Sequence, residues 1–193
     1  MRNLAIFASG SGTNAENLIR YFANHPSIRV KIVLTNNQNA YVLSRANALN
    51  VDTFVFDRCD FYETEKVINI LKKYDADYLV LAGFLWLVPQ RLTAAFPHRI
   101  VNIHPALLPA YGGKGMYGMH VHRAIIAAGE KQSGITIHEV NEEYDRGAIL
   151  FQNSCPITST DTPETLADKI HSLEQAYFPV VVEKWVKERE EKK

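Results

Sequence analysis

The chain has few cysteines and no net charge, and each shortage excludes a class of protein. Two cysteines, Cys59 and Cys155, are too few for a disulfide framework among 193 residues. We expect both to be reduced thiols that pack in the interior. Because 21 basic residues balance 21 acidic ones, no overall positive field attracts nucleic acid, and we predict no nucleic-acid partner.

The sequence also lacks a long hydrophobic run. No apolar stretch approaches the ~20 residues that a membrane helix needs, so we predict no membrane association. The first apolar run, Asn3–Ala8, is too short for a signal-peptide core and leads directly into a glycine-rich loop. We therefore expect a single cytoplasmic domain over residues 1–193, long enough to bury a substantial core.

Short apolar segments alternate with amphipathic ones along the first hundred residues. Strands are expected at 3–8, 30–35, 53–56, 78–82 and 99–104, and helices at 14–24, 41–49, 62–74 and 89–96. This alternation predicts an α/β fold: a Rossmann-like, mostly parallel twisted sheet with helices on both faces. Farther along, we expect a helix at 121–128, two strands at 134–140 and 148–156 that pair antiparallel, and a long helix from residue 162.

The loop Ser9–Ala15 lies between the first expected strand and the first expected helix. Its glycines allow a tight turn, and the N–H groups at the helix start attract an anion. The spacing also fits a dinucleotide fingerprint, but that site needs an acidic residue after the second strand, and Thr35–Asn39 contains none. We favour a phosphate monoester; a tight turn that binds nothing is the alternative.

The tetrad Asn102-Ile103-His104-Pro105 ends the strand expected at 99–104. Residues two apart on a strand share a face, so an amide and an imidazole project together. This pair suits acyl or formyl transfer, in which an oxyanion needs hydrogen-bond donors and a proton must move. Because ligands bind at the carboxyl ends of parallel strands, we expect one cleft to gather the Gly10 loop, Gly83 and Asn102.

An acidic turn at residues 141–147 offers a carboxylate partner for the imidazole. We choose Asp145, because Arg146-Gly147 ends the turn and would hold it rigidly. Such a carboxylate orients His104 and favours its charged form.

Other histidines resemble a metal site only superficially. His120 and His122 stand two apart at a helix start and therefore point in different directions. His138 would be a third ligand, but no cysteine or HExxH spacing supports zinc. We predict no metal, and expect these histidines to shape the site by hydrogen bonding.

Four segments together resemble phosphoribosylglycinamide formyltransferase, a folate-dependent family of purine synthesis. They are Gly10–Asn14, Leu81–Phe84, Asn102–Pro109 and Asp145–Gly147. The resemblance spans nearly the whole chain. It implies formyl transfer from the co-substrate 10-formyltetrahydrofolate to glycinamide ribonucleotide by a monomer or homodimer, with residues 1–100 as a phosphate-binding half and 101–193 as a catalytic and folate-binding half.

The resemblance also implies roles for individual residues. Asn102, His104 and Asp145 would be catalytic, and Asn102 and Asp145 would also contact folate. The phosphate would bind at Gly12, Thr13 and Asn14, and the ribose and glycinamide part at Glu174. The folate pocket would be lined by Leu85, Trp86, Leu87, Val88, Asn141, Glu142, Glu143 and Tyr144. Trp86 stands where the family often has an arginine, and Arg58 is the nearest candidate for another arginine that contacts folate in the family.

Two other functions fit parts of the pattern. A formyltetrahydrofolate deformylase shares the tetrad and uses water in place of the amine. A non-catalytic nucleotide-binding module needs only the glycine loop. Turnover of folate with and without the ribonucleotide separates the first alternative, and nucleotide binding without folate binding identifies the second.

Overall fold

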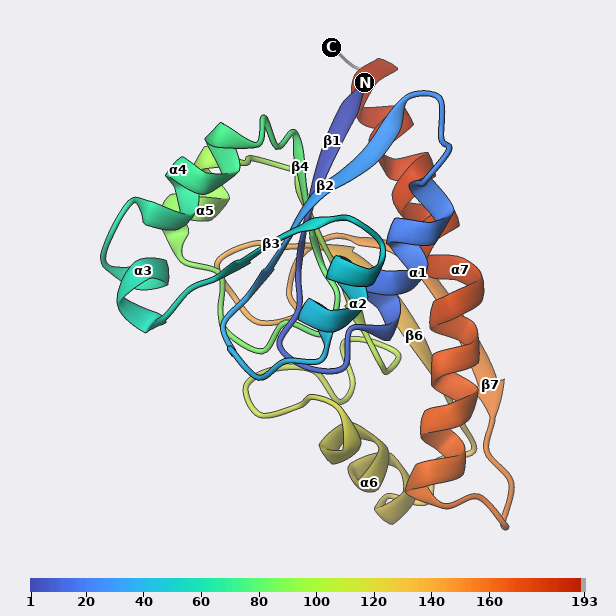
Figure 1. Ribbon diagram of the computed structural model, residues 1–193. Coiled ribbons are helices and arrows are strands. Elements are labelled where there is room, and N and C mark those ends of the chain that lie inside the picture. The colour runs from blue at the N-terminus through green and yellow to red at the C-terminus, as the bar shows by residue number, and fades with distance from the viewer. Residues whose placement is uncertain (192–193) are drawn as a thin grey trace. The chain divides into compact units, whose positions relative to one another are not determined.

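The computed structural model describes residues 1–191 (Figure 1). The chain forms two compact units, Met1–Val101 and Asn102 onward. Seven strands form one sheet in the order β3-β2-β1-β4-β5-β6-β7. The predicted α/β class, with a mostly parallel sheet and an antiparallel addition in the carboxyl-terminal part, is confirmed.

The first unit is built around β1 (Arg2–Phe7), whose residues from Leu4 onward are inaccessible to solvent. It pairs in parallel with β2 (Ile28–Thr35) and β4 (Tyr78–Leu81), and β2 pairs in parallel with β3 (Asp52–Val55). In Figure 1, α1 (Thr13–Phe22) and α2 (Val42–Ala48) lie on one side of these strands. On the other side lie α3 (Arg58–Tyr62), α4 (Lys66–Lys73) and α5 (Gln90–Ala95). Helices on both sides explain the continuous apolar run of β1.

The helix expected at 62–74 is wrong in its boundaries, because two helices occupy this part of the chain. The Asp57 carboxylate accepts a hydrogen bond from the Asp60 N–H at 2.8 Å, and the Asp60 carboxylate accepts one from the Asp57 N–H at 3.4 Å. This capping box starts α3 at Arg58, ahead of the predicted helix. The apolar periodicity that indicated a helix belongs to α4, which buries Val67, Ile68 and Leu71.

The second unit follows β5 (Ile100–His104), the strand within which the unit boundary falls. It contains α6 (Met119–Ala127), β6 (Gln132–Glu139), β7 (Ile149–Pro156) and α7 (Pro163–Glu191). The antiparallel pairing of β6 with β7, predicted from the sequence, is confirmed over Gln132↔Pro156 to His138↔Ile149. α7 packs against this hairpin and buries Phe178, Val182 and Trp185.

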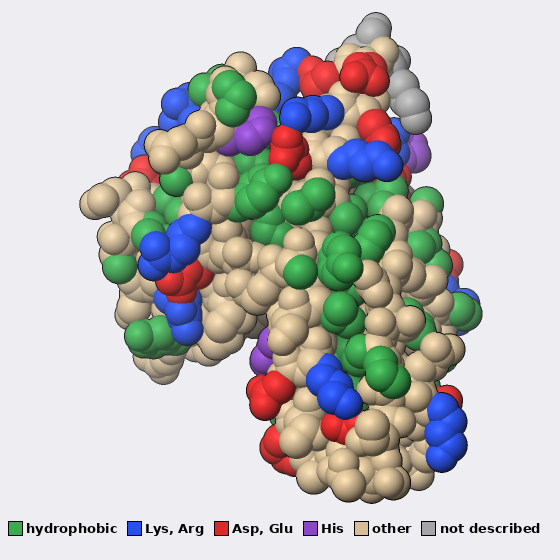
Figure 2. Space-filling model, turned by 90° about the vertical axis from the view of Figure 1, so that its right-hand side faces the viewer, with side chains coloured by type: hydrophobic (Ala, Val, Ile, Leu, Met, Phe, Trp, Pro, Cys, Tyr) green, Lys and Arg blue, Asp and Glu red, His purple; other side chains and the backbone are tan. Residues whose placement is uncertain are grey.

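Some apolar and thiol groups remain accessible. Figure 2 faces the side on which α7 and β7 lie in Figure 1 and shows hydrophobic side chains exposed among polar ones. On these two elements Val180 and Ile149 are about half exposed, at 51% and 49%. Cys155 is partly buried, whereas Cys59 is exposed, so the expected interior packing is wrong for Cys59. It lies on α3, a short helix whose buried residue is Phe61.

Among residues 1–191, no helix combines the length and hydrophobicity needed to cross a bilayer.

Candidate active site

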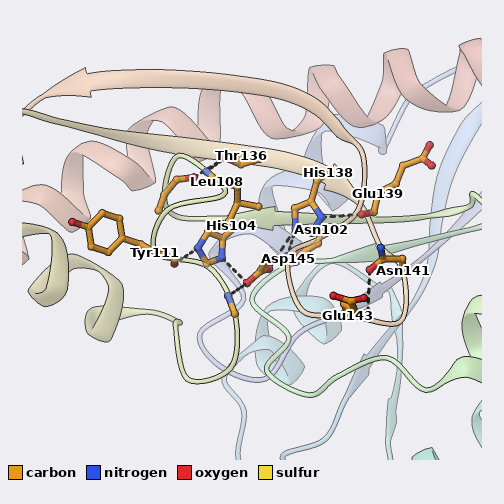
Figure 3. A network of polar contacts seen from close by, with 12 residues as sticks. Asn102, His104, Leu108, Tyr111, Thr136, His138, Glu139, Asn141, Glu143 and Asp145 are labelled. Atoms are coloured by element: carbon orange, nitrogen blue, oxygen red, sulfur yellow. Dashed lines mark hydrogen bonds and ion pairs between the residues drawn. The ribbon is translucent and has the colours of Figure 1, made fainter.

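Asn102 and His104 lie at the end of β5 (Figure 3). They are linked to each other through the side chains of other residues. His104 is 3% exposed and Asn102 is half-buried. The amide Nδ2 of Asn102 lies 3.0 Å from Nε2 of His138, on β6. His104 Nδ1 lies 3.6 Å from Oδ2 of Asp145, in the turn between β6 and β7. The structure thus brings the predicted His104 and Asp145 together directly and adds Asn102 through His138.

Asp145 stands between two imidazoles. Its Oδ1 lies 3.5 Å from Nε2 of His138, and its Oδ2 accepts a hydrogen bond from the Gly113 N–H at 2.8 Å. Only 11% of the Asp145 side chain is exposed. The four residues therefore form one chain of contacts, from His104 through Asp145 and His138 to Asn102.

The local backbone explains how the turn holds Asp145. Asp145 has φ +55°, a left-handed conformation that aspartate tolerates better than most residues. Gly147 packs against the backbone of Glu139: an added Cβ would lie 1.7 Å from the Glu139 carbonyl oxygen. The Glu139 N–H donates to the Ala148 carbonyl at 2.8 Å, which closes the turn. A glycine at 147 is therefore required for the turn to pack against Glu139 and to hold Asp145 in place.

Backbone carbonyls fix which nitrogen of each histidine carries a proton. His104 Nε2 lies 2.8 Å from the Tyr111 carbonyl, and His138 Nδ1 lies 2.8 Å from the Glu139 carbonyl. A carbonyl only accepts, so these two nitrogens donate. In its neutral form, His104 therefore presents a lone pair on Nδ1, the nitrogen that faces Asp145.

Burial sets the protonation state of His104. The loss of solvation lowers the pKa of His104 below its ordinary value, and the nearby charge of His138 adds to this. The Asp145 charge and the hydrogen bond to Tyr111 raise the pKa without reversing the shift. The expectation that Asp145 keeps His104 charged is therefore wrong for the free protein, because desolvation of the imidazolium outweighs the carboxylate.

Asp145 itself is ionised at neutral pH. Burial acts to raise the pKa of Asp145, but the hydrogen bond from His138, the charge of His104 and the Gly113 N–H together lower it. A buried anion with donors on both sides is suited to stabilise a positive charge that arises on either imidazole.

His138 is the member of this network for which sequence reasoning gave no specific partner. Its Nε2 has two neighbours with opposite demands: the Asn102 amide donates to a lone pair, whereas the Asp145 carboxylate needs a proton there. The sequence signal that could have identified His138 was its position near the end of an expected strand, which it shares with Asn102 and His104.

Thr136 holds the segment that follows the tetrad. Its hydroxyl donates to the Ala106 carbonyl at 2.7 Å and accepts from the Leu108 N–H at 2.9 Å. Gln152 Nε2 donates to the same hydroxyl at 2.8 Å and to the Leu108 carbonyl at 2.9 Å. Because Thr136 is fully buried, this network anchors the chain between His104 and Tyr111. Sequence analysis did not identify it, since a threonine inside a strand carries no signal for it.

The other predicted residues of this unit are placed as follows. Glu174 is buried on α7, at 7% exposure. Asn141, Glu142 and Glu143 are exposed in the turn before Asp145, and Tyr144 is half-buried. The Asn141 side chain accepts from the Glu143 N–H at 3.0 Å, which shapes this turn.

His122, on α6, is a buried histidine outside the contact chain. It is 3% exposed, and in the described part of the chain its Nδ1 has no hydrogen-bond partner. Burial lowers the pKa of His122 to about 4, with further contributions from the charges of His171 and His104.

The low pKa of His122 predicts a loss of stability in mild acid. The unfolded chain takes up this proton near pH ~6.5, whereas the folded chain does so only near 4, so the unfolding free energy falls as the pH drops between these values. We expect His122 to account for about 2 kcal/mol of the loss between pH 7 and pH 5. Chemical denaturation at both pH values measures it: His122→Met is expected to reduce the loss, and His120→Met, an exposed neighbour, to leave it unchanged. An equal pH dependence in both variants would contradict the assignment.

In the first unit, the glycine loop joins β1 to α1. Gly12 has φ +76° and directly precedes α1, so Gly12, Thr13 and Asn14 occupy the helix start as predicted. The Ser9 N–H donates to the Gly83 carbonyl at 3.0 Å, and the Ser9 hydroxyl accepts from the Leu85 N–H at 3.1 Å. The Gly10 loop and the Gly83 segment are thus adjacent, as expected; that Asn102 shares a cleft with them stays a prediction.

The segment Leu85–Val88 follows Gly83 and lies against aromatic residues. Leu85 is 42% exposed and Val88 is buried. The Leu87 carbonyl accepts from the Tyr62 hydroxyl at 2.8 Å. The Trp86 ring packs near Tyr62, with centroids 5.9 Å apart, and the Arg58 guanidinium lies 5.8 Å from the Trp86 centroid and 5.0 Å from that of Tyr62. This segment presents apolar surface beside a cation.

Within residues 1–191, no group of three or more His, Cys, Asp or Glu side chains is arranged to hold a metal ion.

Comparison with known proteins assigns the family. The model of the family described as "Formyl transferase" matches residues 2–182. The chain belongs to the formyl transferase family. The resemblance seen in the sequence is therefore confirmed, and the contact chain around Asp145 lies within the formyl transferase match.

Several relatives of this formyl transferase are named phosphoribosylglycinamide formyltransferase. A chloroplastic phosphoribosylglycinamide formyltransferase of Arabidopsis thaliana is 41% identical over 93% of this chain. The phosphoribosylglycinamide formyltransferase of Bacillus subtilis (strain 168) is 32% identical, over 94% of this chain and 93% of its own length. The chain spans only 64% and 62% of two chloroplastic relatives, from Arabidopsis thaliana and Vigna unguiculata. The crystal structure of phosphoribosylglycinamide formyltransferase from Bacillus halodurans matches with a TM-score of 0.85 and 37% identity, over 95% of this chain and 94% of that one.

Proposed function

We propose that this chain transfers a formyl group from 10-formyltetrahydrofolate to the amine of glycinamide ribonucleotide, a step of purine biosynthesis. The observation that carries the proposal is the array of His104, Asp145, His138 and Asn102, in which a buried anion lies between two imidazoles and an amide contacts the second imidazole. The names of the relatives supply the acceptor, and the resemblance to the folate-dependent family supplies the donor.

The array provides both functions that formyl transfer needs. The ribonucleotide amine attacks the formyl carbon, and the carbonyl oxygen becomes an anion in a tetrahedral intermediate. Neutral His104 takes the amine proton, Asp145 stabilises the resulting imidazolium, and the Asn102 amide donates to the oxyanion. The proton then passes from His104 to the folate nitrogen as its bond to carbon breaks. One oxyanion donor is typically worth about 3 kcal/mol, and the positioned acid–base group contributes a further ~10²–10⁴-fold.

The remaining predicted residues bind substrates in this proposal. The helix start at Gly12, Thr13 and Asn14 holds the ribonucleotide phosphate, since N–H groups and the helix dipole favour an anion there. Glu174 contacts the ribose and glycinamide part. Residues 1–100 thus serve as the phosphate-binding half, and 101–193 as the catalytic and folate-binding half.

For folate, we propose contacts with Leu85–Val88 and Asn141–Asp145. The stacking of Arg58 on Trp86 and Tyr62 keeps a guanidinium beside an apolar segment, which suits an aromatic ligand with a carboxylate tail. We further propose that the protein is cytoplasmic, acts on small molecules as a monomer or homodimer, and needs no metal.

Turnover of 10-formyltetrahydrofolate in the presence and absence of glycinamide ribonucleotide tests the proposal. We expect tetrahydrofolate and the formylated ribonucleotide to appear in equal amounts, and no folate turnover without the ribonucleotide. Formate release without the ribonucleotide would identify a deformylase, and nucleotide binding without folate turnover would identify a binding module. Either outcome overturns the proposal.

A further inference from the structure

In the loop between β1 and α1, four consecutive backbone carbonyl groups, those of residues 9–12, each accept a hydrogen bond. The Ser9 carbonyl accepts from Asn37 Nδ2 at 3.4 Å, and the Gly10 carbonyl accepts from the Val42 N–H at 3.1 Å. The Gly12 carbonyl accepts from the N–H of Glu16, one helical turn ahead, at 2.9 Å.

The Ser11 carbonyl, the remaining one of the four, accepts from a side chain. Arg45, on α2, donates to it through Nε at 2.9 Å. In residues 1–191, by contrast, the N–H groups of Gly10, Ser11 and Gly12 have no acceptor. Four engaged carbonyls beside three unengaged N–H groups form a surface that attracts anions.

Arg45 is fixed in place by groups of the protein itself and not by a bound ligand. A guanidinium nitrogen forms an ion pair with Glu16, on α1, and the guanidinium lies 4.9 Å from the centroid of the Tyr41 ring. The hydrogen bonds from Arg20 and Arg45 hold the pKa of Glu16 below its ordinary value, so Glu16 is ionised and offsets part of the charge of the two arginines. Arg45 is therefore oriented toward the loop carbonyl, and its charge is partly offset.

We propose that Arg45 is a positioning residue for the ribonucleotide phosphate: it holds the Ser11 carbonyl away from the anion and leaves recognition to the loop N–H groups. This inference rests on the proposed function. It differs from direct binding of phosphate by arginine, because here the guanidinium is already committed to Ser11 and Glu16. Released from Arg45, the Ser11 carbonyl is able to turn toward the phosphate and repel it.

Steady-state kinetics of four variants test the inference. Arg45→Met is expected to raise KM for the ribonucleotide about tenfold, which corresponds to one lost charge-assisted contact, with kcat within twofold and KM for folate unchanged. Arg45→Lys keeps the charge but lacks Nε, and we expect a similar rise. Arg20→Met is the control, because Arg20 also pairs with Glu16 but does not contact the loop; its KM is expected to stay within twofold.

The fourth variant, Glu16→Gln, separates positioning from direct binding. Loss of the carboxylate frees the Arg45 charge, so a direct phosphate ligand would bind more tightly and KM would fall. We expect KM not to fall. A lower KM in Glu16→Gln, a normal KM in Arg45→Met, or full rescue by lysine would each overturn the inference.

Inorganic phosphate distinguishes failure of the inference from failure of the proposed function. Its stabilisation of the folded protein in thermal unfolding needs no turnover. We expect phosphate to stabilise the wild type and Arg20→Met more than Arg45→Met. If the wild type transfers no formyl group but this difference is observed, the proposed reaction is wrong and the role of Arg45 in the anion site stands. Equal stabilisation of the wild type and both variants overturns that role.

Discussion

Replacing Asp145 with asparagine is expected to lower kcat by about a thousandfold. The substitution keeps the size of the side chain and its capacity to accept from the Gly113 N–H. It removes the anion 3.6 Å from His104 and 3.5 Å from His138, so the imidazolium that forms when His104 takes the amine proton loses its stabilising charge. Single-turnover kinetics with both substrates saturating measure the effect on the chemical step.

A variant with the same loss of charge serves as the control. Asp168 is an exposed carboxylate on α7, and Asp168→Asn is expected to leave kcat within twofold. His104→Ala is expected to lose activity to a similar extent as Asp145→Asn, and the double variant to be little worse than either, because the two residues act as a unit. Additive losses, or near-normal turnover in Asp145→Asn, would contradict the proposed roles.

The same variant reports on the direction of the His104 shift. Burial lowers the pKa of His104, and Asp145 partly offsets this, so removal of the carboxylate should lower it further. An NMR titration of the imidazole nitrogens measures both values, with His104→Ala for assignment. A pKa of His104 above ~6.5 in the free wild type would mean that the imidazole is already protonated before substrates bind. Activity would then fall as the pH rises through that pKa.

Much of the fold follows from local patterns in the sequence. The apolar run of β1 predicts a strand covered on both sides, and the periodicity of residues 62–74 indicates the buried face of α4. The paired strands β6 and β7 were predicted because a charged turn separates two apolar segments. These features depend on residues close together in the chain, which a single sequence displays.

What the sequence did not reveal depends on side-chain hydrogen bonds or on residues far apart in the chain. The capping box of Asp57 and Asp60 starts α3 ahead of the predicted helix, and hydrophobic periodicity is insensitive to such side-chain hydrogen bonds. The neutral state of His104 results from a balance between burial and Asp145, and only coordinates provide the burial. His138 contacts Asn102, 36 residues away in the chain, and Arg45 contacts Ser11, 34 residues away. No sequence motif predicts contacts over such separations.

Gly12→Ala is expected to raise KM for the ribonucleotide about a hundredfold with little change in KM for folate. A Cβ at Gly12 would lie 2.3 Å from Val42 Cγ2 and 2.8 Å from Val42 Cα. The second atom is backbone, so a change of side-chain rotamer does not relieve the clash and the loop must move away from α2. Two displaced N–H contacts to a phosphate, at about 1.5 kcal/mol each, give a loss of this size.

Part of the effect of Gly12→Ala arises from its φ of +76°, which an alanine adopts at a cost of about 1–2 kcal/mol. Gly129→Ala isolates this contribution: Gly129 has φ +67°, and its Cβ would meet no atom within 4 Å. We expect Gly129→Ala to lower the unfolding free energy without changing KM for either substrate, whereas Gly12→Ala changes both quantities. If Gly12→Ala weakened folate as much as the ribonucleotide, the loop would not be the phosphate site, because an anion held by N–H groups is sensitive to the position of the loop in a way that folate bound elsewhere is not.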